Sequence, residues 1–329
     1  MRRTLLLLTA LMLPGLAAAQ GAAPDNWPNR PITLLGGFPN SSGVDLYQRR
    51  LAEPLSRALG VPVIVDNRIG AGGNIASALV ARARPDGYMF LLATAGTHAI
   101  NAALYRNLGF DVFRDVTHIA HLGDVPNILL VNPKRHPDWR TCQDVMAAAR
   151  ARPGAFTYGS TGNGASTHLA GARFAKAAGI DLLHVPFAGQ PMVVTSLLNG
   201  DVDILFNQVG PALGLIQSGE VRALGVTTAG RVSAVADVPT MAEACNLPGF
   251  ESSTWYAVLA PPSLPEPIQR RMNAEINRII SEPGFRSWLV DSQGIVPPTA
   301  TTPEQFRTVH QADIARWGQA VRESGATVD

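Results

Sequence analysis

The sequence predicts an α/β protein of two lobes, each a mostly parallel β-sheet flanked by helices. Short runs of aliphatic and β-branched residues alternate with longer amphipathic runs, several apolar runs end in small polar loops rich in glycine, and the same alternation begins again in the middle of the chain. Such alternation is typical of parallel sheets covered by helices on both faces. A length of 329 residues is sufficient for about two domains.

The beginning of the chain predicts a signal peptide over residues 1–19. The basic pair Arg2-Arg3 precedes an apolar stretch that ends in Ala17-Ala18-Ala19, the small residues expected before a cleavage site at Gln20. A single membrane anchor is the alternative, and we favour it less because the apolar stretch is short for a bilayer span. We therefore expect an exported chain, cleaved near Ala19/Gln20.

The exported chain is predicted to be electrically neutral. The sequence holds 27 Lys and Arg against 25 Asp and Glu, and loss of the two arginines of the signal peptide makes the counts equal. A neutral surface gives no reason to expect nucleic acid or an anionic membrane as a partner. Any recognition of an anion is therefore expected to be local.

The two cysteines, Cys142 and Cys245, occur in a chain expected to reach an oxidising compartment, where a disulfide can form. The sequence does not show whether they lie within bridging distance. Because about a hundred residues separate them and we expect them in different lobes, we predict two separate thiols.

The first lobe is predicted to begin with a strand at 31–35, a polar loop at 36–45 and a helix that ends near Leu59. Ser42 and Asp45 in this loop have the spacing of a capping box. The cap is either satisfied within the helix or leaves donors that face a ligand. Further strands at 61–65 and 88–93, with a glycine-rich turn at 66–74 and a helix at 75–84 between them, continue the alternation.

The second lobe is predicted from the strands at 128–131, 156–158, 181–185, 200–208 and 221–227, with helices between them. Three helical stretches follow, near 266–280, 283–293 and 303–324, and we expect this C-terminal part to pack on the first lobe. The predicted lobes are therefore 30–128 with 229–329, and 129–228. A cleft between two such lobes is a common place for a small-molecule site.

The stretch Tyr158–His168 is the most suggestive loop of the chain. It joins a strand to a helix and combines Gly159, Gly162 and Gly164 with four hydroxyl residues. Glycine lets the backbone approach a ligand, and hydroxyl and amide groups at a helix start are donors for an anion. The loop is predicted to hold a carboxylate or a phosphate. The alternative is an ordinary strand-to-helix turn with a Ser or Thr cap.

A series of motifs extends beyond these two loops. In chain order they are Asp66-Asn67-Arg68-x-Gly70-Ala71-Gly72-Gly73-Asn74, Pro85-Asp86-Gly87-Tyr88, Tyr158-Gly159-Ser160-x-Gly162-x-Gly164 with His168-Leu169-Ala170, Val185-Pro186-Phe187-x-Gly189, Gly200-x-Val202-Asp203, and Arg231 with Asp237-Val238-Pro239-Thr240. With these motifs the chain resembles the periplasmic solute receptors of tripartite tricarboxylate transporters, the Bug family. The resemblance covers nearly the whole mature chain.

The resemblance implies a periplasmic-binding-protein fold, type II-like, with the ligand cleft between the lobes. It implies a monomeric periplasmic receptor, without enzymatic activity, cofactor or metal, that closes on a small carboxylate-bearing solute. Its partners would be the membrane components of a tripartite transporter, or a sensor ectodomain if the receptor serves signalling. Carried onto this chain, the ligand contacts fall on Phe38, Ser41, Ser42, Gly43, Asp45, Asn74, Thr94, Ser160, Thr161, Gly162, Gly164, Ser166, His168 and Asn207.

The chain departs from the family pattern at two places. Asn40-Ser41-Ser42 stands where the family has Pro-Gly-Gly, which exchanges backbone access for hydroxyl donors, and Ala188 stands where the family has a basic residue. Both departures bear on which solute is bound.

Two other kinds of site have weaker support. A secreted serine hydrolase would use Ser160 or Ser166 with His168, but the loop lacks Gly-x-Ser-x-Gly. His118-x-x-His121 would hold a metal only from a helix, and an extended segment would place the two imidazoles on opposite faces. We interpret these histidines as surface residues, and the remaining histidines show no cluster in the sequence.

Overall fold

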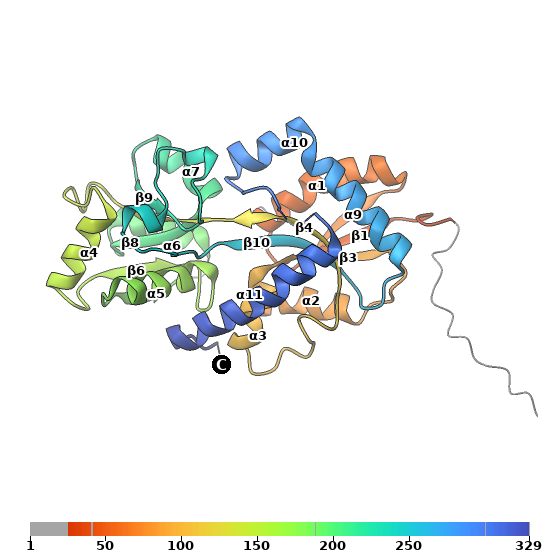
Figure 1. Ribbon diagram of the computed structural model, residues 1–329, viewed down its shortest axis with the longest axis horizontal. Coiled ribbons are helices and arrows are strands. Elements are labelled where there is room, and N and C mark those ends of the chain that lie inside the picture. The colour runs from red at the N-terminus through yellow and green to blue at the C-terminus, as the bar shows by residue number, and fades with distance from the viewer. Residues whose placement is uncertain (1–25, 41, 188, 300, 329) are drawn as a thin grey trace, which may run out of the picture.

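The structure, a computed structural model, describes residues 26–40, 42–187, 189–299 and 301–328. It contains two five-stranded sheets with helices on both faces (Figure 1). The first sheet has the order β2-β1-β3-β10-β4, and the second has the order β7-β6-β8-β5-β9. We call each sheet with its helices the first lobe and the second lobe. The predicted α/β fold of two lobes is confirmed.

The strands of the first sheet are β1 (Ile32–Gly36), β2 (Val63–Asn67), β3 (Met89–Thr94), β4 (Thr117–Val125) and β10 (Thr254–Ala260). Those of the second sheet are β5 (Asn127–Val131), β6 (Thr157–Ser160), β7 (Leu183–Pro186), β8 (Ile204–Gln208) and β9 (Arg222–Val226). In each sheet one strand opposes the others: β10 is antiparallel to β3 and β4, and β5 is antiparallel to β8 and β9.

The opposed strands are those that enter from the other lobe. Strand β4 leaves the first sheet and continues as β5 in the second after a single residue, Pro126, while β10 brings the chain back (Figure 1). A strand arriving from the other lobe enters its new sheet at the edge where the parallel strands end, so it must run against them. The carboxyl ends of the parallel strands in each sheet therefore face the other lobe.

The helices bury one face each against the sheets. In the first lobe, α1 (Gly43–Leu59) and α9 (Glu266–Ser281) cover one face, and α2 (Asn74–Ala81) and α11 (Pro303–Ser324) cover the other. In the second lobe, α4 (Cys142–Ala151), α5 (Ser166–Ala178) and α8 (Met241–Ala244) cover one face, and α6 (Gln190–Asn199) and α7 (Val209–Gln217) cover the other. The remaining short helices are α3 (Asn101–Leu104), α10 (Pro283–Ser287), η1 (Ala71–Gly73), η2 (Gly96–Ile100), η3 (Ser233–Val235) and η4 (Trp288–Ser292).

The cysteine prediction is wrong, because Cys142 and Cys245 form a disulfide. The chain remains with the second lobe after β9: Met241, Cys245 and Phe250 lie in the same apolar core as α4 and α5. The return crossing thus comes later than the boundary expected after residue 228. The two cysteines share one lobe, and the short helix α8 brings Cys245 beside the first turn of α4.

The histidine interpretation also needs correction. The β4–β10 pairing shifts register between Val258 and Leu259, and this irregularity puts His118 and His121 on the same face of the sheet. Both rings lie against Phe306 of α11, at centroid distances of 5.3 and 5.6 Å, and both residues are buried. His310 packs with His118 and hydrogen-bonds the carbonyl of His98, so three histidines do form a buried cluster. No group of three or more His, Cys, Asp or Glu within the described ranges could hold a metal ion.

No helix among the described residues is long and apolar enough to cross a membrane. The predicted signal peptide, residues 1–19, lies outside the described residues.

Candidate functional site

The predicted site residues lie where the two sheets face each other. Strand β1 leads into α1, β3 ends at Thr94, β6 leads into α5 and β8 ends at Gln208. All four strands belong to the parallel sets whose carboxyl ends point towards the other lobe. In α/β folds, ligands bind beyond the carboxyl ends of the strands. The topology therefore brings the predicted loops of both lobes to the same interface.

The loop of the first lobe ends in a capped helix. Ser42 is the N-cap of α1, and its Oγ accepts a hydrogen bond of 3.2 Å from the amide of Asp45. Gly43, the first residue of α1, lies beside the hydroxyl of Tyr256 and the amide side chain of Gln208; a Cβ at Gly43 would be 2.8 Å from the hydroxyl. Ser41 lies outside the described residues. The cap of Ser42 therefore satisfies one amide of the first turn of α1.

The carboxylate of Asp45 is buried and held within the first lobe. It forms an ion pair of 3.0 Å with Arg49 one turn along α1, and accepts a hydrogen bond of 2.6 Å from Asn67 Nδ2. The same Nδ2 donates to Asn40, the residue that replaces the proline of the family pattern. Asp45 thus ties the loop between β1 and α1 to the end of β2.

Three other first-lobe residues lie at the same edge. Asn74 is buried at the start of α2, where its Oδ1 accepts a hydrogen bond of 2.7 Å from Asn101. Thr94 ends β3 and exchanges hydrogen bonds with Thr97 through backbone and hydroxyl groups. Phe38 is partly buried and packs on the first-lobe core. These contacts fix the side chains of Asn74, Thr94 and Phe38 within the first lobe.

The loop of the second lobe is held by its own hydroxyls. Ser160 is fully buried; its Oγ lies 2.7 Å from His184 Nε2 and accepts a hydrogen bond from the amide of Gly162. Thr161 bonds Thr167 through both its amide and its hydroxyl, at 3.0 Å in each case. The hydrogen-bonding groups of these side chains are therefore used within the second lobe, where they shape the loop.

Helix α5 begins without a side-chain cap. Its N-cap is Ala165, which has no side-chain acceptor for the amides of the first turn, and Ser166 is the first helical residue. The amide of Gly164 donates to His168 Nδ1 at 3.0 Å, which turns the Gly162–Gly164 bend back onto the helix. Uncapped first-turn amides carry the positive end of the helix dipole and favour an anion.

His168 and His184 form a pair beneath this loop. Their rings stack with centroids 3.8 Å apart. Burial first, and then the neighbouring His184, lowers the pKa of His168 to about 4, and burial lowers the pKa of His184. Both imidazoles are therefore neutral at neutral pH. The imidazole beside Ser160 is that of His184, so the Ser160–His168 pair considered for a hydrolase is not formed.

Contacts between the lobes also involve three residues outside the predicted ligand contacts: Gln208, Tyr256 and Leu104. The side chain of Gln208 at the end of β8 and the hydroxyl of Tyr256 of β10 both lie beside Gly43, where they interact. Gly164 packs against Leu104 of α3, where an added Cβ would overlap the leucine methyls. Asn207 beside Gln208 is buried, and its Nδ2 has no hydrogen-bond partner in the described part of the chain. The Nδ2 of Asn207 could therefore donate a hydrogen bond to a ligand or to a water molecule.

The sequence offered a signal for some of the missed residues. Gln208 adjoins Asn207, so the two side-chain amides form one signal in the sequence. Tyr256 lies in an aromatic run that predicts core as readily as site, and His184 was visible only as an isolated histidine. Their roles depend on contacts between segments about 24 to 48 residues apart, as the Ser160–His184 and Gln208–Tyr256 pairs show, and local patterns do not encode such contacts.

Two mixed sheets joined by two crossings, with polar loops and helix starts at the interface, define a two-lobed binding-protein fold. The family model described as tripartite tricarboxylate transporter family receptor matches residues 47–326. The chain belongs to this family of periplasmic solute-binding receptors, as the sequence motifs predicted.

Two relatives share this similarity along nearly their whole length. A Pseudomonas sp. (strain P51) protein, described as a UPF0065 protein in the tcbD-tcbE intergenic region, is 36% identical over 299 residues, covering 91% of this chain and 88% of its own. Protein BugT of Bordetella pertussis is 34% identical over 315 residues, covering 94% and 95%.

Solved structures show the same architecture. Rpa4515 of R. palustris, solved with adipate, has a TM-score of 0.82 and 30% identity, covering 92% of this chain and all of its own. MatC of Rhodopseudomonas palustris, solved with bound malate, has a TM-score of 0.78 and 29% identity, covering 90% of this chain and all of its own.

Proposed function

We propose that this receptor closes on a small carboxylate-bearing solute in the periplasm and delivers it to the membrane components of a tripartite tricarboxylate-type transporter. The observation that supports this best is the uncapped start of α5 at the carboxyl edge of the second sheet, which faces the first lobe. Each helix start offers backbone amides to an anion. A site of neutral donors avoids the desolvation cost of a buried arginine–carboxylate pair.

The predicted contact residues take different parts in this proposal. The amides at Gly43 and in the first turn of α5, with the Ser166 hydroxyl, would hold one carboxylate from the two lobes. Asn207, whose Nδ2 is buried without a partner, would face the distal part of the solute. Adipate and malate, present in two structural neighbours, are dicarboxylates of the size that such an arrangement would suit.

Closure of the lobes completes this donor set, so solute binding and hinge motion are coupled. Titration calorimetry over a panel of dicarboxylates and tricarboxylates that includes adipate and malate tests the proposal. We expect saturable heat with at least one member and a micromolar or smaller Kd, about −8 kcal/mol or better. Absence of heat with every member would contradict it.

Delivery to a transporter rests on the family, and a signalling sensor is the second candidate partner. Affinity capture with the solute-loaded chain should recover the transporter membrane components, whereas recovery of a sensor ectodomain alone would favour signalling. N-terminal sequencing of the exported chain should begin at Gln20 if residues 1–19 are the signal peptide.

A further inference from the structure

A hollow lies away from the site described above, where the two lobes meet beside the return crossing. It is open to solvent, with a volume of about 500 Å³, and lies between α5 of the second lobe, the loop at residues 247–250 and α11 of the first lobe. Helix α11 passes below the second lobe and ends near α5 (Figure 1). We call this hollow the hinge pocket. The residues that matter for its chemistry are Arg173, Lys176, Arg316, Gln319 and Glu323.

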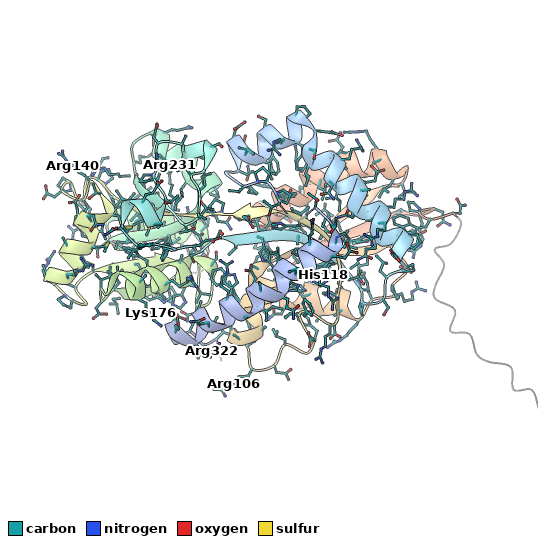
Figure 2. All side chains as sticks on the ribbon, in the orientation of Figure 1. Arg106, His118, Arg140, Lys176, Arg231 and Arg322 are labelled. Carbon is teal, nitrogen blue, oxygen red and sulfur yellow. A yellow bond between two sulfur atoms is a disulfide. The ribbon has the colours of Figure 1, made fainter. Side chains whose placement is uncertain are left out.

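Basic side chains predominate in the hinge pocket, with three cations and one lining carboxylate. Lys176 on α5 pairs with Glu323 on α11 at 2.9 Å, an ion pair that joins the two lobes. Figure 2 shows Lys176 on the side of α5 that faces the end of α11. Arg316 pairs with Asp313 on its own helix at 3.0 Å, and Glu251 lies 4.0 Å from it.

Arg173 is the cation that lacks a carboxylate. Its Nη2 donates to the carbonyl of Glu251 at 3.0 Å, and within the described ranges no carboxylate oxygen lies within ion-pair distance of its guanidinium. Its Nε is buried and has no hydrogen-bond partner among the residues that the structure describes. Burial first, and then repulsion from Arg316, lowers the pKa of Arg173, while the carboxylates of Glu323 and Glu251 act in the opposite direction. An unpaired buried donor on a charged group costs free energy that a bound anion would recover.

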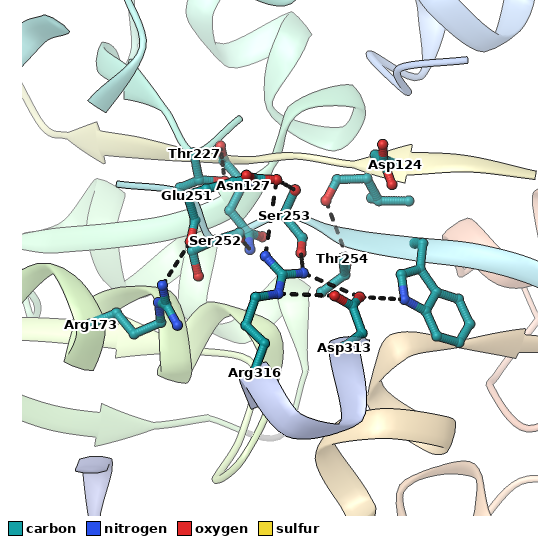
Figure 3. A network of polar contacts seen from close by, with 12 residues as sticks. Asp124, Asn127, Arg173, Thr227, Glu251, Ser252, Ser253, Thr254, Asp313 and Arg316 are labelled. Carbon is teal, nitrogen blue, oxygen red and sulfur yellow. Dashed lines mark hydrogen bonds and ion pairs between the residues drawn. The ribbon is translucent and has the colours of Figure 1, made fainter. Parts of the chain in front are cut away.

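One arginine of each lobe bonds the return crossing, and both lie on the same side of it (Figure 3). Arg173 bonds the carbonyl of Glu251, and Arg316 bonds the carbonyl of Ser253 at 3.2 Å. Asp313, which orients Arg316, also accepts a hydrogen bond of 2.7 Å from Trp255 at the start of β10. A ligand that contacts both arginines would therefore contact both lobes at the hinge.

We propose that the hinge pocket binds a small multivalent oxyanion, with Arg173 as the main ligand and Lys176 and Arg316 as supporting cations. Guanidinium groups present paired donors that match the oxygens of carboxylate, sulfate or phosphate groups. The anion would bridge α5 and α11 and restrain the relative motion of the lobes. This site is independent of the proposed solute, so its test requires no solute.

Titration of the full exported chain with sodium sulfate, followed by ¹H–¹⁵N spectra that include the arginine Nε–H signals, tests this site. Sodium chloride at matched ionic strength is the control salt. We expect saturable sulfate-dependent shifts at Arg173 Nε–H and at the amides of Lys176, Gly249 and Gln319, without a counterpart in chloride. Linear shifts of equal size in both salts would overturn the proposal.

Matched variants distinguish specific binding in the hinge pocket from a general effect of the protein's charge. Arg173→Gln and Lys176→Gln should each weaken sulfate binding about tenfold or more, by analogy with the loss of a charge-assisted hydrogen bond. Arg140→Gln, at the far end of the second lobe (Figure 2), and Lys134→Gln remove the same charges from exposed positions outside the pocket and should leave binding unchanged. Equal weakening by the control variants would overturn the proposal. Lys176 is mostly exposed, so its variant remains informative should Arg173→Gln fail to fold.

Discussion

The imidazole rings of His168 and His184 stack with centroids 3.8 Å apart and planes within 3° of each other. One ring belongs to α5 and the other to β7, so the pair ties the start of the uncapped helix to the edge of the second sheet. The stack is stable only while both rings are neutral, because two imidazolium groups at this distance would repel each other.

Stability should therefore fall as the pH falls. Burial lowers the pKa of His168 to about 4 and lowers those of His184, His98 and His310. In the unfolded chain the histidines bind protons below their ordinary pKa of about 6.5, whereas in the folded chain they bind protons only at lower pH. The free energy of unfolding therefore falls as the pH drops from about 6.5 through the pKa values of the folded chain. Urea unfolding at pH 7.5 and pH 5 should show this loss. His168→Gln should reduce the difference in the free energy of unfolding between pH 7.5 and pH 5. If His168 acts only through packing, the variant should lose the same amount of stability at both pH values.

Gly164 is expected to tolerate no side chain. It has φ of +71°, and a Cβ there would overlap Leu104 of the other lobe. Gly179 has a similar φ of +61° with nothing within 4 Å of an added Cβ, which makes it the matched control. Gly164→Ala and Gly179→Ala should both cost about 1–2 kcal/mol in the free energy of unfolding for the left-handed backbone. Only Gly164→Ala should also weaken solute binding, by about tenfold, because it holds the lobes apart. Equal solute affinities for the two variants would contradict this.

The hydroxyl of Tyr256 should favour the closed arrangement of the lobes. It interacts with the side chain of Gln208 of the second lobe, whereas the hydroxyl of Tyr47 donates a hydrogen bond of 3.0 Å to the carbonyl of Leu122 within the first lobe. A polar contact of this kind contributes about 1 kcal/mol, so each Tyr→Phe variant should lose about that much stability. Calorimetry should show about fivefold weaker solute binding for Tyr256→Phe and no change for Tyr47→Phe. Solute affinity of Tyr256→Phe equal to that of the wild type would rule out an interlobe role.

Ser166→Asp tests the uncapped helix start directly. A carboxylate in the first turn of α5 interacts favourably with the helix dipole, so the free energy of unfolding should stay level or rise by about 0.5 kcal/mol. The same carboxylate would compete with that of the solute, and affinity should fall tenfold or more. Gln143→Asp places a carboxylate in the first turn of α4, at the outer end of the second lobe, and should leave affinity unchanged (Figure 1). If Ser166→Asp binds the solute with wild-type affinity, the solute carboxylate does not lie at the start of α5, and the prediction is wrong.

The disulfide between Cys142 and Cys245 should make a large contribution to stability. It closes a loop with a sequence separation of 103 residues, for which the chain-entropy argument gives about 4–5 kcal/mol. Urea unfolding with a phosphine reductant should show a loss of this order. The Cys142→Ala/Cys245→Ala double variant should be less stable and insensitive to reductant. A wild-type transition unaffected by reductant, after the bond is shown to be reduced, would contradict the prediction.

The sequence predicted most elements of the fold because their signals are local. The helices expected near 266–280 and 303–324 appear as α9 and α11, and the strands that end in polar loops appear as β1, β3 and β8. Strand β10 carried no such signal. All seven of its residues are buried, since it lies in the middle of the sheet with helices on both faces, and the alternation of buried and exposed residues is lost.

The candidate site divides in the same way. The glycine and hydroxyl loops were visible because turns and helix caps depend on residues a few positions apart. The contacts of Gln208 with Tyr256, of Ser160 with His184 and of Gly164 with Leu104 join separate elements, two of them in different lobes. No local pattern specifies them.

The sequence by itself determined the fold class, the family and the loops in which an anion site is expected, because hydrophobic period and turn chemistry are properties of short segments. Only the tertiary structure decided that Cys142 meets Cys245, that His118 and His121 share a face, and that the return crossing begins after residue 250. Each of these depends on how segments far apart in the chain pack together, which is settled by the burial of whole faces and by strand register.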